Sequence, residues 1–322
     1  MHHVLVTGGA GFIGSHTVER LLSLGHRVTV LDDFSTGRRE NLAAVSGHSC
    51  LRVVEGDVAE PIGPQLAEAV GGFGPVTEVL HLAAQVSVAL SVSEPLEDAR
   101  RNLVGTLRVL EFARELQVDK VVFASSAAAY GDGPQPAHEG LECRPLSPYG
   151  LHKLAGEHHL RIHSELTGLG ALSFRFFNVF GPRQSPRSHY AGVISIFIGR
   201  ALAGELLSIF GKGDATRDFV YVGDLVSALV KGLFSGPRRG EVLNVGTGVP
   251  TSVATLARTV IEVTGSASPV VELPSRAGDI LHSRADATRI REALGWSAET
   301  PLASGLGATA AWLREAAGGG VF

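Results

Sequence analysis

The sequence predicts an α/β protein, with a doubly wound parallel sheet followed by a smaller C-terminal domain. Two observations lead to this fold class. Short apolar runs alternate with amphipathic segments of helical period through the first half of the chain, which is typical of parallel strands covered by helices. After Phe177 the segments become shorter and richer in Gly, Pro and Arg. We therefore expect a first domain at 1–177, rejoined by 224–247, and a second region at 178–322.

The expected strands are mostly continuous apolar runs, as in parallel strands that are buried on both faces. In chain order they are Val4–Thr7, Arg27–Leu31, Leu51–Glu55, Val79–Leu82, Val121–Ala124, Leu172–Phe176 and, much later, Val242–Val245.

The expected helices fall between these runs. They are Phe12–Leu24, a segment with an apolar stripe at Leu103, Leu107 and Leu110, a segment from Ser147-Pro148 to about Leu166, and Asp224–Phe234. Gly25 ends the first helix, because glycine readily adopts the left-handed conformation found at helix ends. Pro148 suits the first turn of a helix, where no backbone N–H is needed.

Composition and charge exclude several classes of protein. Of the 322 residues, 44% are apolar and 19% are charged, so the chain can bury a core and is not disordered. The net charge of −4 excludes a basic protein that coats nucleic acid. The longest apolar stretch, Ala191–Gly199, is far shorter than the ~20 residues of a membrane helix. We expect neither a nucleic-acid nor a membrane partner.

The cysteines and histidines indicate no metal site and no disulfide. Cys50 and Cys143 are far apart in the sequence, and the histidines lack metal-ligand spacing. A strand at Val4, directly after the N-terminus, does not resemble a signal peptide. These features suit a protein of the reducing cytoplasm.

A glycine-rich turn directly follows the first expected strand. Gly8, Gly11 and Gly14 match GxxGxxG, and Gly9 with the last two also gives GxGxxG. Glycines permit a tight turn and a close backbone approach. The N-terminus of the following helix then offers free N–H groups and a partial positive charge to a pyrophosphate. The pattern predicts a Rossmann-type dinucleotide site.

An acid follows at the position that selects the dinucleotide. Asp32 ends the second strand, 18 residues after Gly14. A carboxylate there can accept both ribose hydroxyls and repels a 2′-phosphate, which favours NAD over NADP. Arg38 and Arg39 follow a few residues later and keep NADP open.

A tyrosine and a lysine provide a candidate acid–base pair. Tyr149 and Lys153 are four residues apart, which places them on one face of a helix. A free tyrosine titrates at about 10. We expect the Lys153 ammonium and a positive nicotinamide to lower the pKa of Tyr149, so that it can act as a base. Ser126 ends the fifth expected strand, at the ligand-binding edge of such a sheet, where it can bond to a substrate hydroxyl.

Together these motifs resemble the extended short-chain dehydrogenase/reductase family, and further stretches are similar to its nucleotide-sugar epimerase branch. The stretches are Gly8–Gly14, His81–Gln85, Ser125–Gly131, Tyr149–Lys153, Phe176–Gln184, Thr216–Val222 and Arg276–Asp279. The resemblance implies a cytoplasmic homodimer with tightly bound NAD, which inverts carbon 4 of a UDP-hexose through a 4-keto intermediate.

The resemblance also implies the site residues, in three groups. The catalytic residues are Ser126, Tyr149 and Lys153. The NAD-binding residues are Gly8, Gly11, Phe12, Ile13, Gly14, Asp32, Asp33, Ser35, Thr36, Gly37, Asp57, Val58, Leu82, Ala83, Ala84, Gln85, Asn102, Tyr149, Lys153 and Phe176. The UDP-sugar-binding residues are Ser87, Ser126, Tyr149, Asn178, Val193, Ser208, Phe210, Arg217, Arg276, Asp279 and Ser283. Arginine also suits a diphosphate chemically, because its guanidinium binds phosphate oxygens in a fork.

Residues that differ from the motifs of related enzymes reduce the number of reactions that the sequence can support. Sugar 4,6-dehydratases carry an acidic pair where Ala127 and Ala128 stand, and alanine cannot move protons. Uronic-acid 4-epimerases carry an Arg where Ser185 stands, but Arg187 could replace it, so UDP-glucuronate stays open as substrate. A sugar-nucleotide 4-reductase and, more remotely, a non-catalytic NAD-binding regulator also stay open. Ser283 replaces the Tyr of enzymes restricted to UDP-glucose and UDP-galactose, so we expect UDP-N-acetylglucosamine to be accepted too.

Overall fold

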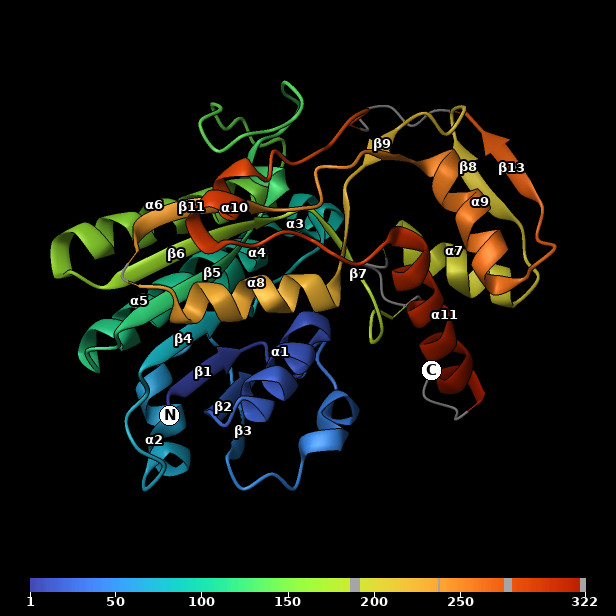
Figure 1. Ribbon diagram of the computed structural model, residues 1–322. Coiled ribbons are helices and arrows are strands. Elements are labelled where there is room, and N and C mark those ends of the chain that lie inside the picture. The colour runs from blue at the N-terminus through green and yellow to red at the C-terminus, as the bar shows by residue number, and fades with distance from the viewer. Residues whose placement is uncertain (186–191, 237, 275–279, 319–322) are drawn as a thin grey trace. The chain divides into compact units, whose positions relative to one another are not determined.

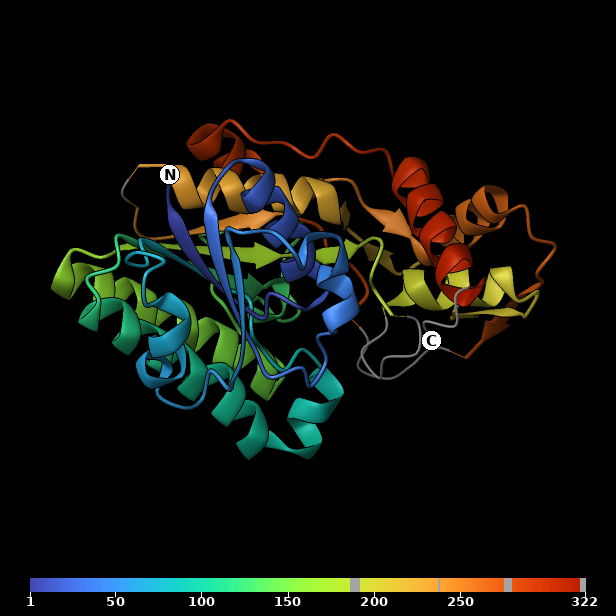
Figure 2. The same cartoon turned by 90° about the horizontal axis from the view of Figure 1, so that it is seen from below.

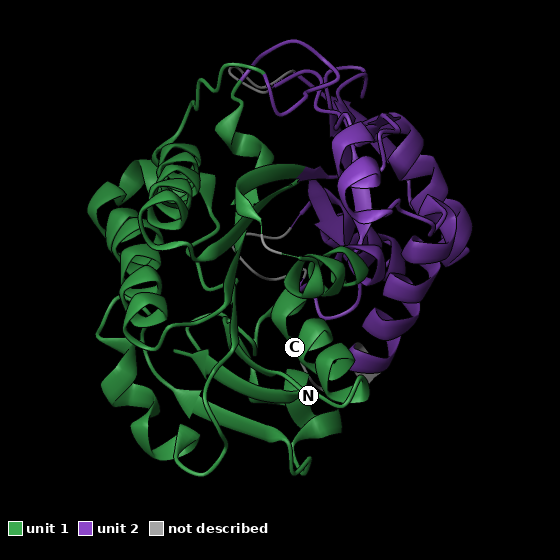
Figure 3. Ribbon diagram, turned by 60° about the vertical axis from the view of Figure 1, so that its left-hand side comes forward, with its two compact units in different colours: residues 1–131, 141–176, 226–243 green, residues 132–140, 177–225, 244–322 purple. Residues whose placement is uncertain are grey.

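The structure is a computed structural model, and it describes residues 1–185, 192–236, 238–274 and 280–318 (Figure 1). The chain divides into two compact units, which Figure 3 colours separately. Unit 1 comprises 1–131, 141–176 and 226–243, and unit 2 comprises 132–140, 177–225 and 244–322.

A seven-stranded sheet with the order β11-β6-β5-β4-β1-β2-β3 forms the centre of unit 1. Its strands are β1 (His3–Thr7), β2 (Arg27–Asp32), β3 (Leu51–Glu55), β4 (Glu78–His81), β5 (Lys120–Ser126), β6 (Gly170–Phe176) and β11 (Arg239–Val245). All pairings from β3 to β6 are parallel. The predicted doubly wound parallel sheet is therefore confirmed.

Several strands begin earlier than the apolar runs predicted. β4 begins at Glu78, which is 4% exposed and lies opposite Val4 in the register. The Glu78 carboxylate lies 2.6 Å from the ring of His2. β5 begins at Lys120, whose Nζ donates to the carbonyl oxygen of Ser235 at 2.6 Å. A buried charged residue that has a hydrogen-bond partner can thus lie within a strand, although the hydropathy pattern predicts that the strand begins only after it.

Helices cover both faces of the sheet. They are α1 (Phe12–Ser23), α2 (Ile62–Val70), α3 (Val88–Ser93), α4 (Pro95–Ala99), α5 (Gly105–Glu115), α6 (Pro148–Thr167) and most of α8 (Val222–Phe234), with the short helices η1 (Arg39–Val45), η2 (Arg100–Val104) and η3 (Ala127–Ala129). Figure 2 shows α1 and α8 along one face of the sheet and α5 and α6 along the other. Two covered faces explain why β1 is buried at every residue.

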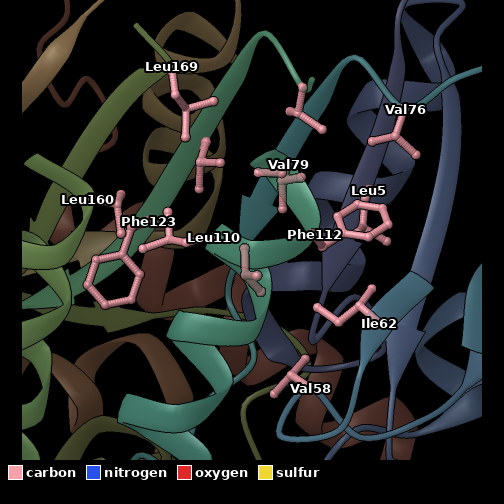
Figure 4. Close-up of a cluster of buried hydrophobic side chains, with 14 of the residues drawn as sticks. Leu5, Val58, Ile62, Val76, Val79, Leu110, Phe112, Phe123, Leu160 and Leu169 are labelled. Atoms are coloured by element: carbon pink, nitrogen blue, oxygen red, sulfur yellow. The ribbon is translucent and has the colours of Figure 1, made fainter. Parts of the chain in front are cut away.

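One hydrophobic core of unit 1 lies between the sheet and the helices of one face (Figure 4). Leu5 and Val79 from the sheet meet Leu110 and Phe112 from α5 and Ile62 from α2, and each is at most 3% exposed. Burying one such side chain contributes about 1.5–3 kcal/mol, so this contact holds α5 and α2 against the strands.

Unit 2 has its own core and much shorter strands. Its helices are α7 (Val193–Leu202), α9 (Val253–Thr264), α10 (Thr288–Leu294) and α11 (Leu302–Gly318). Its strands are β7 (Asn178–Phe180), β8 (Leu207–Phe210), β9 (Thr216–Arg217), β10 (Phe219–Tyr221), β12 (Thr251–Ser252) and β13 (Val270–Leu273). They form three two-stranded sheets, β7 with β10, β8 with β13 and β9 with β12. Phe197, Leu256 and Leu306 pack together from α7, α9 and α11.

The strand order reverses between β1 and β4. From β1 the chain adds β2 and β3 on one side, and it then returns to place β4 on the other side. Ligands of open α/β sheets bind at the carboxyl ends of the strands at such a reversal.

Among the helices that the structure describes, none is long and apolar enough to cross a membrane.

Candidate active site

The turn between β1 and α1 is built from closely packed glycine backbone. Gly8 has a left-handed φ of +70°, and a Cβ on it would lie 2.7 Å from the amide nitrogen of Ala83. A Cβ on Gly14 would lie 2.1 Å from the carbonyl oxygen of Gly8. Gly11 precedes α1 and supplies no side-chain cap. The amides of 12–14 have no acceptor within the helix and can therefore receive a phosphate.

Asp32 ends β2 and is only 5% exposed. Its Oδ2 accepts a hydrogen bond from the amide of Ala10 at 2.9 Å, and its Oδ1 accepts one from Phe34 at 2.9 Å. A Cβ on Gly37 would lie 2.6 Å from Oδ1, so this loop can approach the carboxylate because the residue is glycine. Burial raises the pKa of Asp32, and the two amide bonds oppose that shift. Each oxygen keeps a second lone pair for a ribose hydroxyl.

Two arginines that the sequence did not single out organise the neighbouring loops. Arg101 donates to Asp33 Oδ2 at 3.2 Å and to Ser35 Oγ at 3.0 Å. Arg100 donates to Asp57 Oδ2 at 2.8 Å. The other expected NAD contacts of unit 1 are exposed Thr36, buried Val58, and half-buried Phe12, Ile13, Leu82, Ala83, Ala84 and Phe176.

The segment after β4 is held by its own side chains. Gln85 donates its backbone N–H to Asn102 Oδ1 at 2.9 Å, and Asn102 Nδ2 donates to the backbone carbonyl oxygen of Gln85 at 2.9 Å. Gln85 Nε2 also donates to the carbonyl oxygen of Ser87 at 2.8 Å. Ser87 in turn caps α3 by accepting from the amide of Leu90 at 3.0 Å. All three expected site residues are thus buried and bonded within unit 1.

The structure brings Ser126, Tyr149 and Lys153 together. Ser126 is the last residue of β5, and Tyr149 lies in the first turn of α6, where the Ser126 side chain lowers the pKa of its phenol. Lys153 is 4% exposed, and its Nζ donates to the carbonyl oxygen of Ala124 at 2.8 Å. A Cβ on Gly150 would lie 2.6 Å from the carbonyl oxygen of Ala128, so a glycine lets α6 approach the turn after β5.

The electrostatics of this group differ from the sequence expectation. Burial raises the pKa of Tyr149, the Ser126 side chain opposes the shift, and the charge of Asp98 adds to it. Burial lowers the pKa of Lys153 to about 8, and Asp98 opposes that shift. Without a nicotinamide, the net shift of the Tyr149 pKa is upward, so the expected lowering stays a prediction for the protein with NAD bound. The Lys153 ammonium lies 5.9 Å from the Tyr149 ring centroid and is bonded to a backbone carbonyl, so it does not offset the loss of water.

A buried ion pair ties together the elements that carry the triplet. Arg175 on β6 donates to both carboxylate oxygens of Glu157 on α6, at 2.9 and 2.7 Å. The hydroxyl of Ser125, next to Ser126, donates to the same carboxylate. Both charged side chains are about 5% exposed, so the pair fixes β5, β6 and α6, which carry the three candidate residues, to one another.

Several expected UDP-sugar residues lie in unit 2. Arg217 on β9 donates to the carbonyl oxygen of Thr216 at 2.9 Å, and Ser283 donates its amide N–H to that same oxygen at 3.1 Å. The structure thus places Arg217 beside Ser283. The buried carboxylate of Asp218 accepts from the amides of Thr247, Gly248 and Ala285, and so fixes these segments.

The remaining substrate candidates are dispersed over unit 2. Asn178 is exposed, whereas Val193, Ser208 and Phe210 are half-buried. Arg200 donates to Ser208 Oγ at 3.4 Å. The expected phosphate-binding Arg276 and ribose-binding Asp279 lie outside the described residues. Within the described chain, no group of three or more His, Cys, Asp or Glu side chains could hold a metal.

Comparisons with known proteins agree on one family. Residues 4–246 match the family model "NAD dependent epimerase/dehydratase family". The chain is 42% identical to a UDP-glucose 4-epimerase of Mycolicibacterium smegmatis, over 97% of this chain and 98% of that protein. The solved UDP-glucose 4-epimerase of Thermus thermophilus in complex with NAD superposes with a TM-score of 0.87 at 39% identity, over 98% of this chain and 99% of the other. A UDP-N-acetylglucosamine 4-epimerase of Methanobrevibacter ruminantium, in complex with UDP-N-acetylmuramic acid, superposes with a TM-score of 0.91 at 34% identity, over 98% of both chains.

Proposed function

Because the chain belongs to the NAD-dependent epimerase/dehydratase family, we propose that it inverts carbon 4 of a UDP-hexose. The observation that carries the proposal is the placing of Tyr149 near the Ser126 hydroxyl, with buried Lys153 one helical turn later. Ala127 and Ala128 follow Ser126 and hold no acid for an elimination. Proton exchange at a single hydroxyl, without dehydration, is what this arrangement can perform.

The glycine turn and Asp32 fit NAD. The close approach of Gly14 to Gly8 creates a turn with no room for a Cβ, and the first amides of α1 lie ready for a pyrophosphate. Asp32 keeps lone pairs for a ribose. When bound, NAD would supply reversible hydride transfer at carbon 4 of the sugar. The epimerisation is redox-neutral overall, so we expect the cofactor to be retained between turnovers.

The proton chemistry falls to the triplet. Ser126 receives the 4-hydroxyl of the sugar in a hydrogen bond and directs its proton to Tyr149. Tyr149 removes that proton and returns it when the inverted sugar forms. Its raised pKa means that the hydroxyl holds its proton at neutral pH until charges arrive nearby. A bound nicotinamide would bring such a charge, and Lys153 adds to it as an ammonium, because its pKa of about 8 lies above neutrality.

Unit 2 is proposed to hold the nucleotide part of the substrate. Arg217 would bind the diphosphate together with Arg276, while Asn178, Val193, Ser208, Phe210 and Asp279 would contact the UDP moiety. Arg217 is half-buried on a short strand beside Ser283, which suits a fixed cation next to the sugar. The serine supports a pocket with room for a 2-acetamido group, and the similarity to a UDP-N-acetylglucosamine 4-epimerase favours such a substrate.

We also propose that the protein is a cytoplasmic homodimer. Large apolar side chains are exposed on α3, α4 and α6, including Val92 (63%), Leu96 (86%) and Leu151 (53%). A second copy of the chain could cover them. Cys50 and Cys143 are both free, as suits a reducing compartment. Sedimentation of the purified protein tests the dimer, and a monomer at micromolar concentration would contradict it.

The decisive experiment for the proposed function is a substrate panel with the purified protein. UDP-glucose, UDP-N-acetylglucosamine and UDP-glucuronate are incubated separately, and the 4-epimers are resolved by chromatography. We expect conversion of UDP-glucose to UDP-galactose without added cofactor, and a loss of ~10²–10⁴-fold in Tyr149→Phe, as is typical when a general base is removed. No epimer from any substrate, or wild-type turnover in Tyr149→Phe, contradicts the proposal.

A further inference from the structure

Asp98 on α4 carries a completely buried carboxylate in unit 1. Its Oδ1 accepts hydrogen bonds from Gln85 Nε2 at 2.7 Å and from Asn102 Nδ2 at 2.8 Å. Its Oδ2 lies 2.6 Å from Nδ1 of His152. A carboxylate can only accept, so this imidazole nitrogen carries the proton. Donors from three separate segments therefore fix the negative charge in place.

The Asp98 carboxylate is hydrogen-bonded to the turn of α6 that carries Tyr149 and Lys153. His152 lies on α6, three residues after Tyr149 and directly before Lys153. The imidazole is 13% exposed, so its bond to Asp98 is largely shielded from water. The negative charge raises the pKa of Tyr149 and also that of Lys153, in which it opposes the larger lowering by burial.

The other ionisable groups around this turn have partners of their own. Glu97, next to Asp98, pairs with Arg100 and Arg101. Glu157 on α6 pairs with Arg175, and burial lowers the pKa of His81 at the end of β4 to about 3, which keeps it neutral. The sequence of α3 contains no ionisable side chain. Asp98, by contrast, is held by two neutral amides and an imidazole, so its charge still acts on Lys153.

We propose that Asp98 and His152 are positioning residues for the reaction: Asp98 supplies a fixed negative charge, and His152 holds that carboxylate against the turn of α6 that carries Tyr149 and Lys153. The inference rests on the proposed function, because it assigns these two residues a role in that same proton transfer. Neither residue needs to touch the substrate or NAD.

Asp98→Asn is the direct test, because it removes the charge and keeps the shape. His152 can change tautomer and accept from the new amide N–H, so the hydrogen bonds can survive. The pKa values of Lys153 and Tyr149 should both fall without the negative charge. We expect both limbs of the pH profile of kcat/KM to move to lower pH, by about one unit. The basic limb reports loss of the Lys153 ammonium.

Variants of His152 provide a second and independent test. His152→Ala removes the bond that holds the buried carboxylate against α6, and it should shift the profile in the same direction as Asp98→Asn. His152→Asn returns an amide N–H near the position of Nδ1 and should restore the wild-type profile. Matched controls on α6 are Glu165→Gln, an exposed carboxylate-to-amide change, and His158→Ala, an exposed imidazole deletion, and neither should shift the profile.

A second readout does not require turnover. The holoenzyme is passed through gel filtration at a series of pH values, and the NAD retained is measured. Lys153 in its ammonium form is proposed to hold the cofactor, so retention should fail at lower pH in Asp98→Asn than in wild type.

If wild type retains NAD but epimerises no UDP-sugar, the proposed function fails, and this readout alone decides the inference. If Asp98→Asn does not fold, the comparison of His152→Ala with His152→Asn decides it. Unshifted pH dependence of both rate and retention in the folded variants overturns the inference.

Discussion

Replacing Gly14 by alanine would introduce one methyl group into the tightest contact of the glycine turn. That Cβ would lie 2.1 Å from the carbonyl oxygen of Gly8 and 2.7 Å from the Cα of Gly9. Both neighbours are backbone atoms, which cannot rotate away as a side chain can. Alanine in a helix would by itself be favoured by roughly 0.5–1 kcal/mol over glycine, so propensity and sterics oppose each other here. We expect the steric contact to dominate, because the turn must open to relieve it.

The size of the effect follows from the cost of overpacking. One extra methyl in a packed region typically costs ~1–3 kcal/mol. If the turn opens at the pyrophosphate site, that energy is lost from NAD binding, which corresponds to a roughly five- to 150-fold weaker affinity. The fold should survive, because the contact lies at the end of β1 and not in the hydrophobic core of unit 1.

The assay is the NAD content of the purified variant, followed by calorimetric titration with NAD. Gly63→Ala is the matched control: it is the same substitution on α2, where an added Cβ has nothing within 4 Å. This control should keep NAD affinity and gain up to ~1 kcal/mol in the free energy of unfolding. Gly14→Ala with wild-type NAD affinity would refute the reasoning, since a turn that absorbs a methyl at 2.1 Å cannot be the close-packed cradle described above.

Three further substitutions probe other parts of the molecule. Glu157→Gln leaves the guanidinium of Arg175 buried without its carboxylate and should lower the free energy of unfolding by ~3–5 kcal/mol in urea denaturation; a loss no larger than that of the exposed pair variant Glu165→Gln, ~0–1 kcal/mol, would contradict this. Arg217→Ala should weaken calorimetric UDP binding roughly ten- to 100-fold and leave the NAD content unchanged, because a charge-assisted hydrogen bond contributes ~1.5–3 kcal/mol; unchanged UDP affinity removes Arg217 from the site. Ser283→Tyr should lower kcat/KM for UDP-N-acetylglucosamine selectively, because a phenol ring would occupy the space of the acetamido group; an equal loss for UDP-glucose would count against the pocket.

The parts of the fold that sequence predicts well are those with local patterns. The β1 strand, the glycine turn, α1 and the acid that ends β2 lie within one short segment, so their spacing is visible in the sequence. The central strands β1 and β4 are buried at every residue, and their apolar runs therefore stand out. The strands of unit 2 are different, since Thr216–Arg217 and Thr251–Ser252 are two residues long and too short to show any period.

Contacts between distant segments explain what the sequence could not show. Asp98 and His152 are 54 positions apart in the sequence. Both are polar residue types that usually lie at the surface, so nothing in the sequence indicates that the fold buries them. Arg175 is similar, because a charged residue within an apolar strand gives no sign of its partner. The upward contribution of burial to the Tyr149 pKa was not foreseen, because a motif of two residues does not report burial.

The order in which the chain supplies unit 1 has a consequence for its synthesis. The last segment of unit 1, 226–243, provides most of α8 and of β11, the strand that borders β6. Residues 177–225, which belong to unit 2, are therefore synthesised before the seven-stranded sheet of unit 1 can be completed. Until then the nascent chain exposes β6 as an open edge with unpaired N–H and C=O groups, a surface to which other chains can add. A fragment ending near Phe176 would keep the glycine turn and the proposed catalytic residues, but its β6 edge would remain unpaired. The dinucleotide-binding half of the protein is therefore not a module that one cut in the gene can isolate.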